Sequence, residues 1–256
     1  MPSYAVLGAT GQTGNSLLKV LMQSKDNNIN AYCRNKSKLL GQFPEYANDS
    51  RLRIFDGSLK DTEVLANCCR GVGAVLMTVA AKENEPGCSV AIDTARQVIA
   101  AMEVLRDETG GQKLPTLVQL NSASTEPILS RTIPHFAHAM LYRAMYNVYK
   151  DLENAERFLR QYSDWLNIVY FKPAAISHDV QGGHVLSLEE SASPVSFLDV
   201  AAGMIEAADE GEKYAGKAVS VLPKSGKAKI PWEAPLALLK GLVLYYFPWT
   251  WRWLGA

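Results

Sequence analysis

Tyr146 and Lys150 are the residues whose type and spacing point most directly to chemistry, because they stand four apart in a stretch with helical character. On a helix, positions i and i+4 share a face, so both side chains would point the same way. An ammonium group beside a phenol favours the phenolate and lowers the pKa of the phenol from about 10. Such a tyrosine can donate a proton to a carbonyl as hydride arrives, or act as the base in the reverse direction.

Two serines, Ser122 and Ser124, end an apolar run and have hydroxyl groups that can hold a substrate oxygen. Turn or helix capping is their alternative role. Two other tyrosines compete with Tyr146, but Tyr142 is two helical turns from Lys150 and Tyr149 is on another helical face. The predicted catalytic residues are therefore Ser122, Ser124, Tyr146 and Lys150.

The elements that must position these residues are short apolar strands alternating with helices. Strands are expected at residues 4–9, 29–34, 51–57, 74–80, 116–122 and 165–173, and helices at 12–24, 61–70, 88–109 and 135–162. The apolar runs are largely continuous, which is typical of strands buried on both faces. Regular alternation predicts an α/β fold, a doubly wound parallel sheet of Rossmann type, with its ligand crevice at the carboxyl ends of the strands.

After Pro173 this rhythm changes. Further strands are expected at residues 184–188 and 217–222, and a helix at 193–211 that stops at Gly211. We therefore divide the 256 residues into a nucleotide-binding core, residues 1–175, and a small substrate-side lobe with an aromatic tail, residues 176–256, integrated with the core.

The glycine-rich stretch GATGQTG, residues 8–14, directly follows the first expected strand and precedes a helix. This context is the one that a dinucleotide-binding turn requires. Gly8 would permit the tight turn, Gly11 would let the backbone approach a pyrophosphate, and Gly14 would let the helix pack closely on the strand. The helix N-terminus would offer free N–H groups to the phosphates. We therefore expect a bound dinucleotide that contacts Gly8, Thr10, Gly11, Gln12, Thr13 and Gly14.

Arg34 stands at the end of the second expected strand, where a site for NAD usually has an acidic residue. A guanidinium group cannot accept a hydroxyl proton but can clamp a 2′-phosphate, so the sequence favours NADP(H). The alternative is that Arg34, Lys36 and Lys38 belong to a solvated loop. Asp56 is placed to bond the adenine amino group. The remaining cofactor-binding residues predicted from position are Lys38, Gly57, Thr78 and Lys150.

Composition excludes several classes of function. Lys and Arg together equal Asp and Glu at 26 each, so nothing draws the chain to nucleic acid, and the basic stretch 224–229 is too short to do so alone. The four cysteines lack CxxC spacing, which indicates buried, reduced thiols rather than a metal or disulfide framework. No secretory signal is evident at the N-terminus, so a cytoplasmic location is expected.

The histidines and the C-terminal tail leave alternatives open. His135 and His138 lack further metal ligands, so we expect a helix-start or pocket-lining role and no metal site. His178 and His184 flank the loop after the sixth strand and either line the substrate site or are solvated. Residues 236–256 are rich in aromatics, and four roles compete for them: a lid over a flat substrate, a homodimer contact, a membrane-interface contact, or packing on the chain's own core.

Several motifs together resemble the short-chain dehydrogenase/reductase superfamily, most of all its atypical, NmrA-like branch. They are GATGQTG, the FDG turn, LNSAS, the Tyr146–Lys150 pair and YKDLENAERFLR…WLNIVYFKPAAI, and they span about residues 4–222. The opening and the aromatic C-terminus resemble fungal averufin oxidase A-like proteins of aromatic polyketide pathways. The resemblance implies NADP(H) at Gly8, Gly11, Gly14 and Arg34, a Ser-Tyr-Lys set at Ser122, Tyr146 and Lys150, and Pro173 at the nicotinamide end. The segment TVAAKENEPG departs from the pattern of many relatives.

These observations lead to one expected function and two alternatives. We expect an NADP(H)-dependent reductase of a carbonyl or quinone in a small aromatic, polyketide-like substrate of secondary metabolism. The NmrA-like branch also contains dinucleotide sensors, and related pathway enzymes run cyclisations, dehydrations or isomerisations. A non-redox enzyme and an NADP-sensing regulator on the same fold therefore remain as alternatives.

Overall fold

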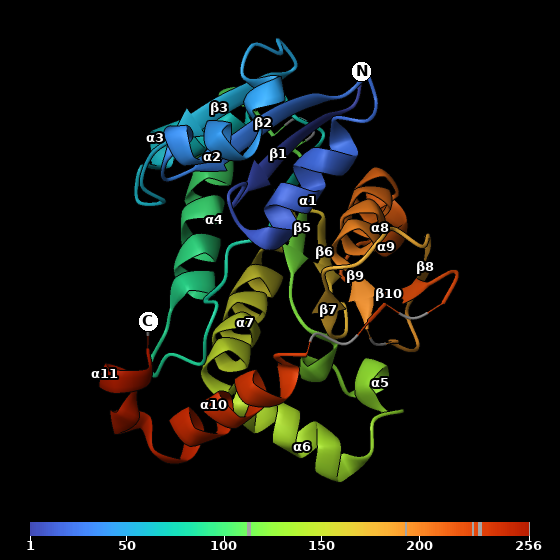
Figure 1. Cartoon of the computed structure of the whole chain (residues 1–256). Coiled ribbons are helices and arrows are strands. Elements are labelled where there is room, and N and C mark those ends of the chain that lie inside the picture. The colour runs from blue at the N-terminus through green and yellow to red at the C-terminus, as the bar shows by residue number, and fades with distance from the viewer. Residues whose placement is uncertain (112–113, 193, 227, 230–231, 256) are drawn as a thin grey trace.

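The fold is an eight-stranded sheet between two layers of helices, seen in a computed structural model that describes residues 1–111, 114–192, 194–226, 228–229 and 232–255 (Figure 1). The strand order is β3-β2-β1-β4-β5-β6-β10-β8. Neighbouring strands from β3 to β10 are parallel, and only β8 runs antiparallel, against β10. The predicted doubly wound, Rossmann-type parallel sheet is confirmed.

The strands match the apolar runs of the sequence closely. Their bounds are β1 (Ser3–Leu7), β2 (Asn28–Cys33), β3 (Leu52–Asp56), β4 (Ala74–Met77), β5 (Thr116–Leu120), β6 (Ile168–Phe171), β7 (Ile176–Ser177), β8 (His184–Ser187), β9 (Val195–Ser196) and β10 (Ala218–Pro223). The short strands β7 and β9 pair with each other outside the main sheet. Both lie beyond the sixth strand, where the expected rhythm changes.

The helices fill the connections between strands and form the tail. Their bounds are α1 (Gln12–Leu21), α2 (Lys36–Gln42), α3 (Thr62–Cys69), α4 (Val90–Thr109), α5 (Pro127–Ser130), α6 (His135–Ala144), α7 (Tyr146–Leu159), α8 (Phe197–Asp209), α9 (Gly211–Tyr214), α10 (Ala234–Tyr246) and α11 (Trp251–Leu254). Short 3₁₀ turns lie at Pro44–Tyr46, Ala123–Thr125 (η2), Arg160–Tyr162 and Pro248–Thr250 (η4).

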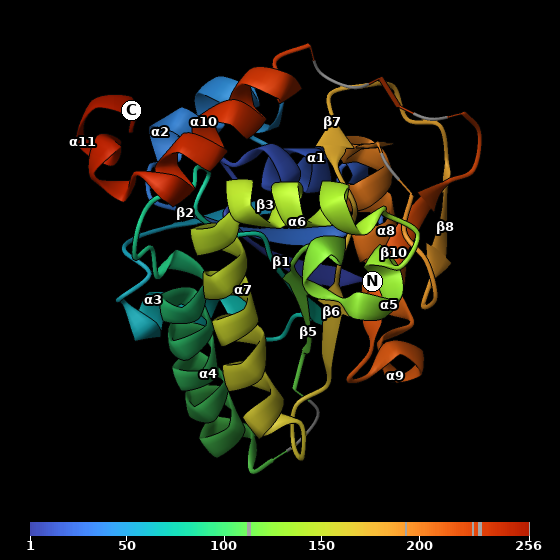
Figure 2. The same ribbon diagram turned by 90° about the horizontal axis from the view of Figure 1, so that it is seen from below.

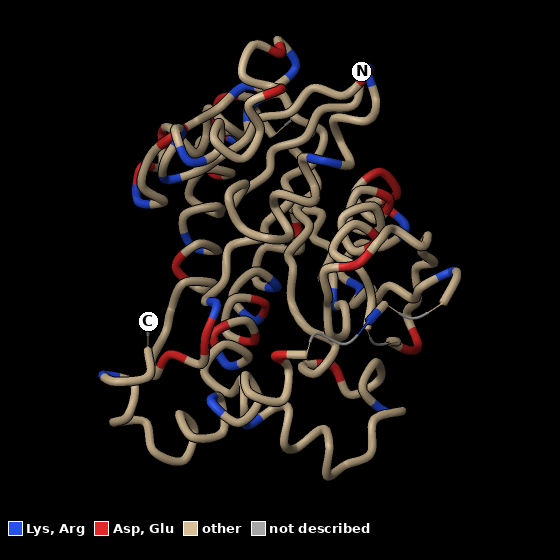
Figure 3. Tube along the Cα trace, viewed as in Figure 1, with Lys and Arg blue, Asp and Glu red and all other residues tan. Residues whose placement is uncertain are grey.

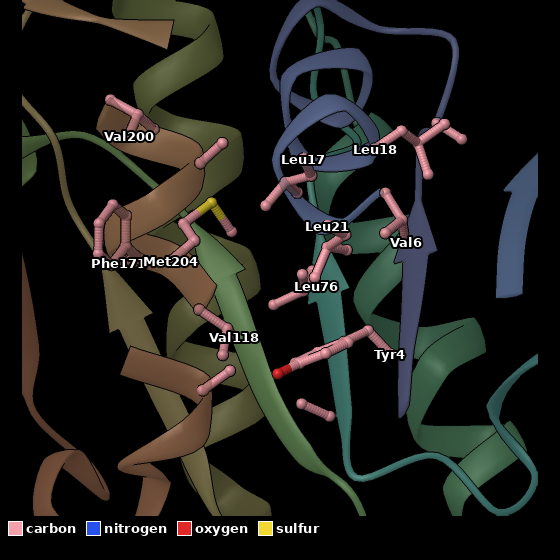
Figure 4. Packing of buried hydrophobic residues seen from close by; sticks show 14 of the residues in the cluster. Tyr4, Val6, Leu17, Leu18, Leu21, Leu76, Val118, Phe171, Val200 and Met204 are labelled. Carbon is pink, nitrogen blue, oxygen red and sulfur yellow. The ribbon is translucent and has the colours of Figure 1, made fainter. Parts of the chain in front are cut away.

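The core consists of two apolar layers, one on each face of the sheet. Leu17 and Leu21 of α1 and Met204 of α8 point toward the strands on the first face (Figure 4). Residues of α3, α4 and α7 cover the second face. Central-strand residues such as Val6 and Val75 have no exposed surface. Burial on both faces explains why the strands read as continuous apolar runs in the sequence.

The single helix expected over residues 135–162 is wrong, because the chain breaks it at Met145. Met145 leaves the helical conformation with φ −119° and ψ 22°, so α6 and α7 are separate helices. At the break, the backbone N–H of Asn147 donates to the side-chain oxygen of Asn84 at 2.8 Å. A buried amide from a distant loop therefore takes over a hydrogen-bonding role at this helix start.

The helix expected over residues 193–211 also differs from the structure. The helix found there, α8, begins at Phe197, after the short strand β9, and ends at Asp209, and residue 193 lies outside the described residues. Gly211 does not stop it but starts α9. A Cβ at Gly211 would lie 2.6 Å from the Thr116 hydroxyl oxygen, so this glycine is explained by close packing against β5.

The tail folds back beneath the carboxyl edge of the sheet. Figures 1 and 2 show α10 running along α6, with α11 beyond its far end near the C-terminus. The contact is close at Gly241, where an added Cβ would overlap with the carbonyl oxygen of Ala144. Among the described residues, no helix has the length and apolar character needed to cross a bilayer.

Candidate active site

The glycine turn has the geometry that a close backbone approach demands. Gly8 has φ +89°, in the region that favours glycine, and a Cβ there would lie 3.0 Å from the Thr78 hydroxyl oxygen. The N–H of Gly11 donates to the Gly8 carbonyl oxygen at 2.9 Å. A Cβ on Gly14 would overlap with that same carbonyl oxygen. Gly8 is therefore required by its backbone conformation and Gly14 by packing, which lets α1 lie directly against the end of β1, whereas a Cβ on Gly11 would make a tight contact of 3.2 Å with the Gly8 carbonyl oxygen.

The start of α1 faces the turn without a competing anion. Gly11 is the N-cap, and within the described part of the chain no side chain caps the helix and no acidic residue stands in its first turn. Gln12, Thr13 and Gly14 form that first turn. Their backbone N–H groups and the helix dipole make this end a site for an anion.

A cavity of about 380 Å³ opens in front of this turn. Of the predicted cofactor-binding residues, Gly8, Thr10, Gly11, Arg34, Lys38 and Thr78 line it. Thr78 donates its hydroxyl proton to the Leu7 carbonyl oxygen at 2.7 Å, which fixes the end of β4 beside the turn. Asp56 and Gly57 lie at the end of β3 outside the lining, and buried Pro173 follows β6, where its carbonyl accepts from Ala123 at 2.9 Å.

The basic residues after β2 are held in an ordered helix start rather than in a loop. Asn35 caps α2 by accepting from the N–H of Lys38 at 2.8 Å. This cap fixes the backbone of Arg34 and Lys38 beside the cavity. Both side chains are exposed, and neither forms an ion pair with any described residue. Two cations therefore remain available to a ligand in the cavity.

Tyr146 and Lys150 lie near each other, but the lysine is paired elsewhere. The Lys150 Nζ is 5.9 Å from the centroid of the Tyr146 ring and 5.8 Å from that of Tyr142. It donates to Glu153 Oε2 at 2.8 Å, and this contact raises the pKa of Lys150. The break between α6 and α7 brings Tyr142 as close to Lys150 as Tyr146 is, so the expected separation of Tyr142 by two turns is wrong.

Tyr142 and Tyr146 differ in what their hydroxyl groups do. The Tyr142 hydroxyl donates to Glu153 Oε1 at 2.5 Å, and burial together with this hydrogen bond raises the pKa of Tyr142 to about 12. The hydroxyl of Tyr146 makes no hydrogen bond with the residues that the structure describes. Its ring packs edge-on against Tyr245 of α10, with centroids 5.1 Å apart. Of these two tyrosines, Tyr146 is therefore the one whose hydroxyl has no partner among the described residues.

The two predicted serines are used differently from each other. Ser122 caps η2, because its hydroxyl oxygen accepts from the N–H of Ser124 at 3.3 Å, and it lines neither of the cavities described here. Ser124 lines a second cavity of about 540 Å³ together with His138, Tyr142 and Glu153. The capping role weighed for these serines thus holds for Ser122.

Comparison with known proteins identifies the family. Residues 8–211 match the model of a family described as NAD(P)H-binding. The chain belongs to this NAD(P)H-binding family. It is similar over its whole length to "Oxidoreductase aflX" of Aspergillus parasiticus, at 44% identity with 96% of that protein covered, and to "Oxidoreductase ordB" of Dothistroma septosporum, at 42% identity with 96% covered. The resemblance inferred from the motifs is confirmed at this level.

A solved structure shares the fold. A short-chain dehydrogenase/reductase from Veillonella parvula, in complex with NADP, superposes with a TM-score of 0.67 and 16% identity, over 90% of this chain and 99% of that one. A dinucleotide fits the residues present in this NAD(P)H-binding chain. The glycines leave no Cβ in the turn, the start of α1 is uncapped, and two free cations edge the cavity.

Three residues of the NAD(P)H-binding site were not foreseen. Trp251 of α11 lines the cofactor cavity, so the tail forms part of its wall. Glu83 and Asn84, between β4 and α4, hold α10 in place: Glu83 pairs with Lys240 at 2.7 Å, and buried Asn84 donates to the Gly241 carbonyl oxygen at 3.1 Å. The signals in the sequence were the departure of TVAAKENEPG from the pattern of many relatives and the aromatic composition of residues 236–256, for which a lid over the substrate was one of the expected roles.

The remaining predicted residues fall at the edge of the site or outside it. His178 shares a 2.9 Å hydrogen bond with Gln12 of α1, beside the glycine turn. His184 pairs with Glu206 on α8 at 2.8 Å, away from both cavities. Lys172, a buried lysine that the sequence did not single out, forms ion pairs with Glu126 at 3.0 Å and Glu156 at 2.8 Å. This network locks the ends of β5 and β6 together.

Proposed function

We propose that this protein is an NADP(H)-dependent reductase that acts on a carbonyl or quinone carbon of a small aromatic, polyketide-like molecule. One observation carries the proposal. The turn at Gly8 and Gly11, where no Cβ blocks the backbone, opens into a cavity lined by Arg34 and Lys38, which have no ion-pair partner among the described residues. The full-length similarity to proteins named oxidoreductases in fungi supports the redox assignment.

Different groups of the chain bind different parts of the dinucleotide along the cavity. The first turn of α1 offers backbone N–H groups to the pyrophosphate. Arg34 and Lys38 contact the 2′-phosphate, where a guanidinium can make two parallel hydrogen bonds and an ammonium acts as a point charge. When bound, the nicotinamide supplies or accepts the hydride. These contacts favour NADP(H) over NAD(H), because an unphosphorylated ribose leaves both cations without a partner.

Tyr146 supplies the proton in this proposal. Its hydroxyl is not committed to a partner among the described residues, whereas that of Tyr142 is bound to Glu153. Lys150 sits 5.9 Å from the Tyr146 ring and is positioned by Glu153. Its charge therefore acts on Tyr146 through space rather than through a direct hydrogen bond. Tyr146 protonates the substrate oxygen as the hydride reaches the carbon.

The aromatic surroundings of Tyr146 support a flat, apolar substrate. Tyr146 packs against Tyr142 and Tyr245, with ring centroids 6.2 and 5.1 Å away, and Tyr142 in turn packs against Tyr149 at 5.5 Å. Aromatic side chains bind flat rings through edge and stacking contacts. The tail contributes Tyr245, so it helps exclude water from the tyrosine that donates the proton.

One observation favours a non-redox enzyme as a second candidate. Lys150 is bound to Glu153, and Ser122 caps a turn, so the Ser-Tyr-Lys set is not assembled as a direct hydrogen-bonded group. The linked groups Tyr142, Glu153 and Lys150 instead form an acid–base network that needs no hydride. A cyclisation, dehydration or isomerisation at the second cavity would use such a network.

The experiment follows nicotinamide absorbance when purified protein, NADPH and aromatic quinones or ketones are mixed. The proposal predicts that NADPH is consumed in proportion to the reduced product. Product formed without cofactor would contradict it and favour the non-redox enzyme. NADPH binding without consumption of NADPH across such substrates would contradict it and favour a sensor.

A further inference from the structure

Large apolar side chains gather on one outer face of the molecule. We call it the tail face and define it by Phe136 of α6, Leu236 and Leu239 of α10, and the neighbouring Phe247, Trp249 and Trp253. Each of these side chains is between 48 and 78% exposed. Scattered exposed apolar residues are ordinary, but a group this aromatic on adjoining elements marks a surface that contacts something.

The tail face is one continuous surface rather than a set of isolated residues. Helix α10 lies along α6 at the close contact of Gly241 with Ala144, and α10 continues through η4 into α11 (Figure 2). The ion pair between Lys240 and Glu83 fixes α10 to the loop after β4. The tail face is therefore held by the fold and does not depend on a partner to form.

The charges carried by the helices of the tail face, α6, α10 and α11, are of one sign. Between Ala234 and Gly255 the only charged residues are Lys240 and Arg252, and Arg143 is the only one in α6 apart from two histidines. The nearest acidic residue in the sequence is Glu233, before the start of α10, and the acid in contact with α10 is Glu83, which pairs with Lys240 at 2.7 Å. Figure 3 shows long tan stretches along this lower layer, in contrast to the mixed charges on the helices above. Glu83 neutralises Lys240, but Arg143 and Arg252 form no ion pair with a described residue. Apolar aromatics together with such unpaired cations complement an anionic lipid surface.

We propose that the tail face docks the protein onto a lipid membrane surface that carries anionic headgroups. Helix α10 lies in the plane of the interface, and Trp249 and Trp253 enter the headgroup region, where the amphipathic indole ring is favoured. Arg252, which stacks 4.0 Å from the Trp253 ring centroid, contacts the headgroup phosphates. The assignment rests on the surface alone and does not depend on which reaction the protein performs.

A second copy of the chain is a poorer occupant of the tail face. In a two-fold dimer the face would meet itself, and α6, α10 and α11 of both copies would bring Arg143, Lys240 and Arg252 but no Asp or Glu to the contact. Like charges brought together in this way cost free energy. A lipid surface supplies the missing negative charge and tolerates the irregular outline of the aromatic residues.

Docking would place both cavities next to the lipid. Trp251 lines the cofactor cavity from α11, while His135, His138 and Tyr142 line the second cavity from α6. The same two helices carry the tail face. An apolar molecule dissolved in the bilayer would therefore meet the protein on the side of α6 and α11, the helices that help line the two cavities.

The test is flotation of the full-length protein with phosphatidylcholine vesicles, with and without phosphatidylserine. Wild type is expected to float with the phosphatidylserine vesicles and to blue-shift its tryptophan emission, less so as salt is added. The double variant Trp249→Ser, Trp253→Ser should partition onto the vesicles at least about tenfold more weakly, because it lacks the two indole rings that enter the headgroup region. Val180→Ser, which removes a 79% exposed side chain elsewhere, is the matched control and should float like wild type.

Three outcomes would overturn the proposal. The first is that wild type fails to float with phosphatidylserine vesicles, or floats equally well with pure phosphatidylcholine. The second is that the double variant floats like wild type while its unfolding temperature is unchanged. The third is a concentration-dependent dimer of the wild type, seen by light scattering, that the double variant converts to a monomer.

Discussion

The glycine turn and the junction between α6 and α7 are both parts of the proposed active site, but they are built in opposite ways. In the turn, Gly8, Gly11 and Gly14 contact one another within seven residues of chain. At the junction, Asn84 bonds Asn147 63 residues away and Gly241 157 residues away. The turn is therefore a local structure with little space for added side-chain atoms, whereas the junction depends on the loop after β4 and on the tail.

This difference says which part of the site can be modulated. Removing the tail contacts leaves the glycine turn intact, because none of its hydrogen bonds reaches the tail. The same change would release Tyr146 from Tyr245 and Trp251 from the cofactor cavity. Variants in the two regions should thus separate dinucleotide binding from the placement of the proton donor.

The largest effect is expected for Gly14→Ala, which tests the turn. The new Cβ would overlap with a backbone oxygen of Gly8 that cannot move without displacing β1 or α1. We expect the free energy of unfolding to fall by at least about 3 kcal/mol. NADPH binding should be lost with the structure of the turn. Gly41→Ala is the control, since a Cβ there meets nothing within 4 Å, and it should be neutral or slightly stabilising. Thermal unfolding of both variants checks this; equal unfolding temperatures would contradict it.

Tyr146→Phe tests the junction and should have the next largest effect. Loss of the proton donor is expected to lower turnover by about 10²- to 10⁴-fold and to leave the Kd for NADPH nearly unchanged. Tyr142→Phe is the matched variant on the neighbouring helix and should keep turnover within a few-fold, because its hydroxyl is bound to Glu153. Steady-state kinetics with NADPH titration decides between them. A reversed order would assign the proton to Tyr142 instead.

Trp251→Ala tests whether the tail belongs to the cofactor site. Because Trp251 lines the cavity, its removal should raise the Kd for NADPH about five- to tenfold. Trp253→Ala, two residues on, removes an exposed indole that does not line the cavity and should leave the Kd unchanged. Fluorescence titration of the two variants measures both values. An equal response of both indoles would mean that the tail does not contribute to the cavity wall.

The smallest effect concerns stability at alkaline pH. Burial and the hydrogen bond to Glu153 raise the pKa of Tyr142 to about 12, whereas an unfolded tyrosine has a pKa of about 10. A raised folded-state pKa gives stability that is complete below about pH 10 and is lost as the pH rises through about 12. Tyrosinate absorbance during a pH titration of wild type and Tyr142→Phe follows this group. Ionisation of Tyr142 near pH 10 would show that the hydroxyl is neither buried nor bound to Glu153 in solution.

Much of the fold and the nucleotide half of the site could be predicted because their signals are local. Continuous apolar runs mark strands buried on both faces, and the glycines at Gly11 and Gly14 are explained by the Gly8 carbonyl oxygen a few residues away. The position of Arg34 at the end of β2 follows from the strand alone. Even here the sequence did not show that Asn35 caps α2 and fixes Arg34 and Lys38 in place.

The catalytic half could not be predicted to the same depth because its geometry is set by distant residues. The helical pattern from His135 onward gives no sign of the break at Met145, which depends on Asn84 and on α10. Without that break, spacing alone puts Tyr142 far from Lys150. Likewise, the aromatic tail indicated contact with something apolar, but only the folded chain places Tyr245 and Trp251 in the site.

The most direct test of the account is a comparison of NADPH and NADH binding to wild type and to Arg34→Ala, Lys38→Ala, with Lys36→Ala as control. Lys36 is an exposed neighbour that does not line the cavity. We predict that wild type and Lys36→Ala bind NADPH about 10- to 100-fold more tightly than NADH, and that the double variant loses this preference. Equal affinity of wild type for the two cofactors, or a preference for NADH, would contradict the account.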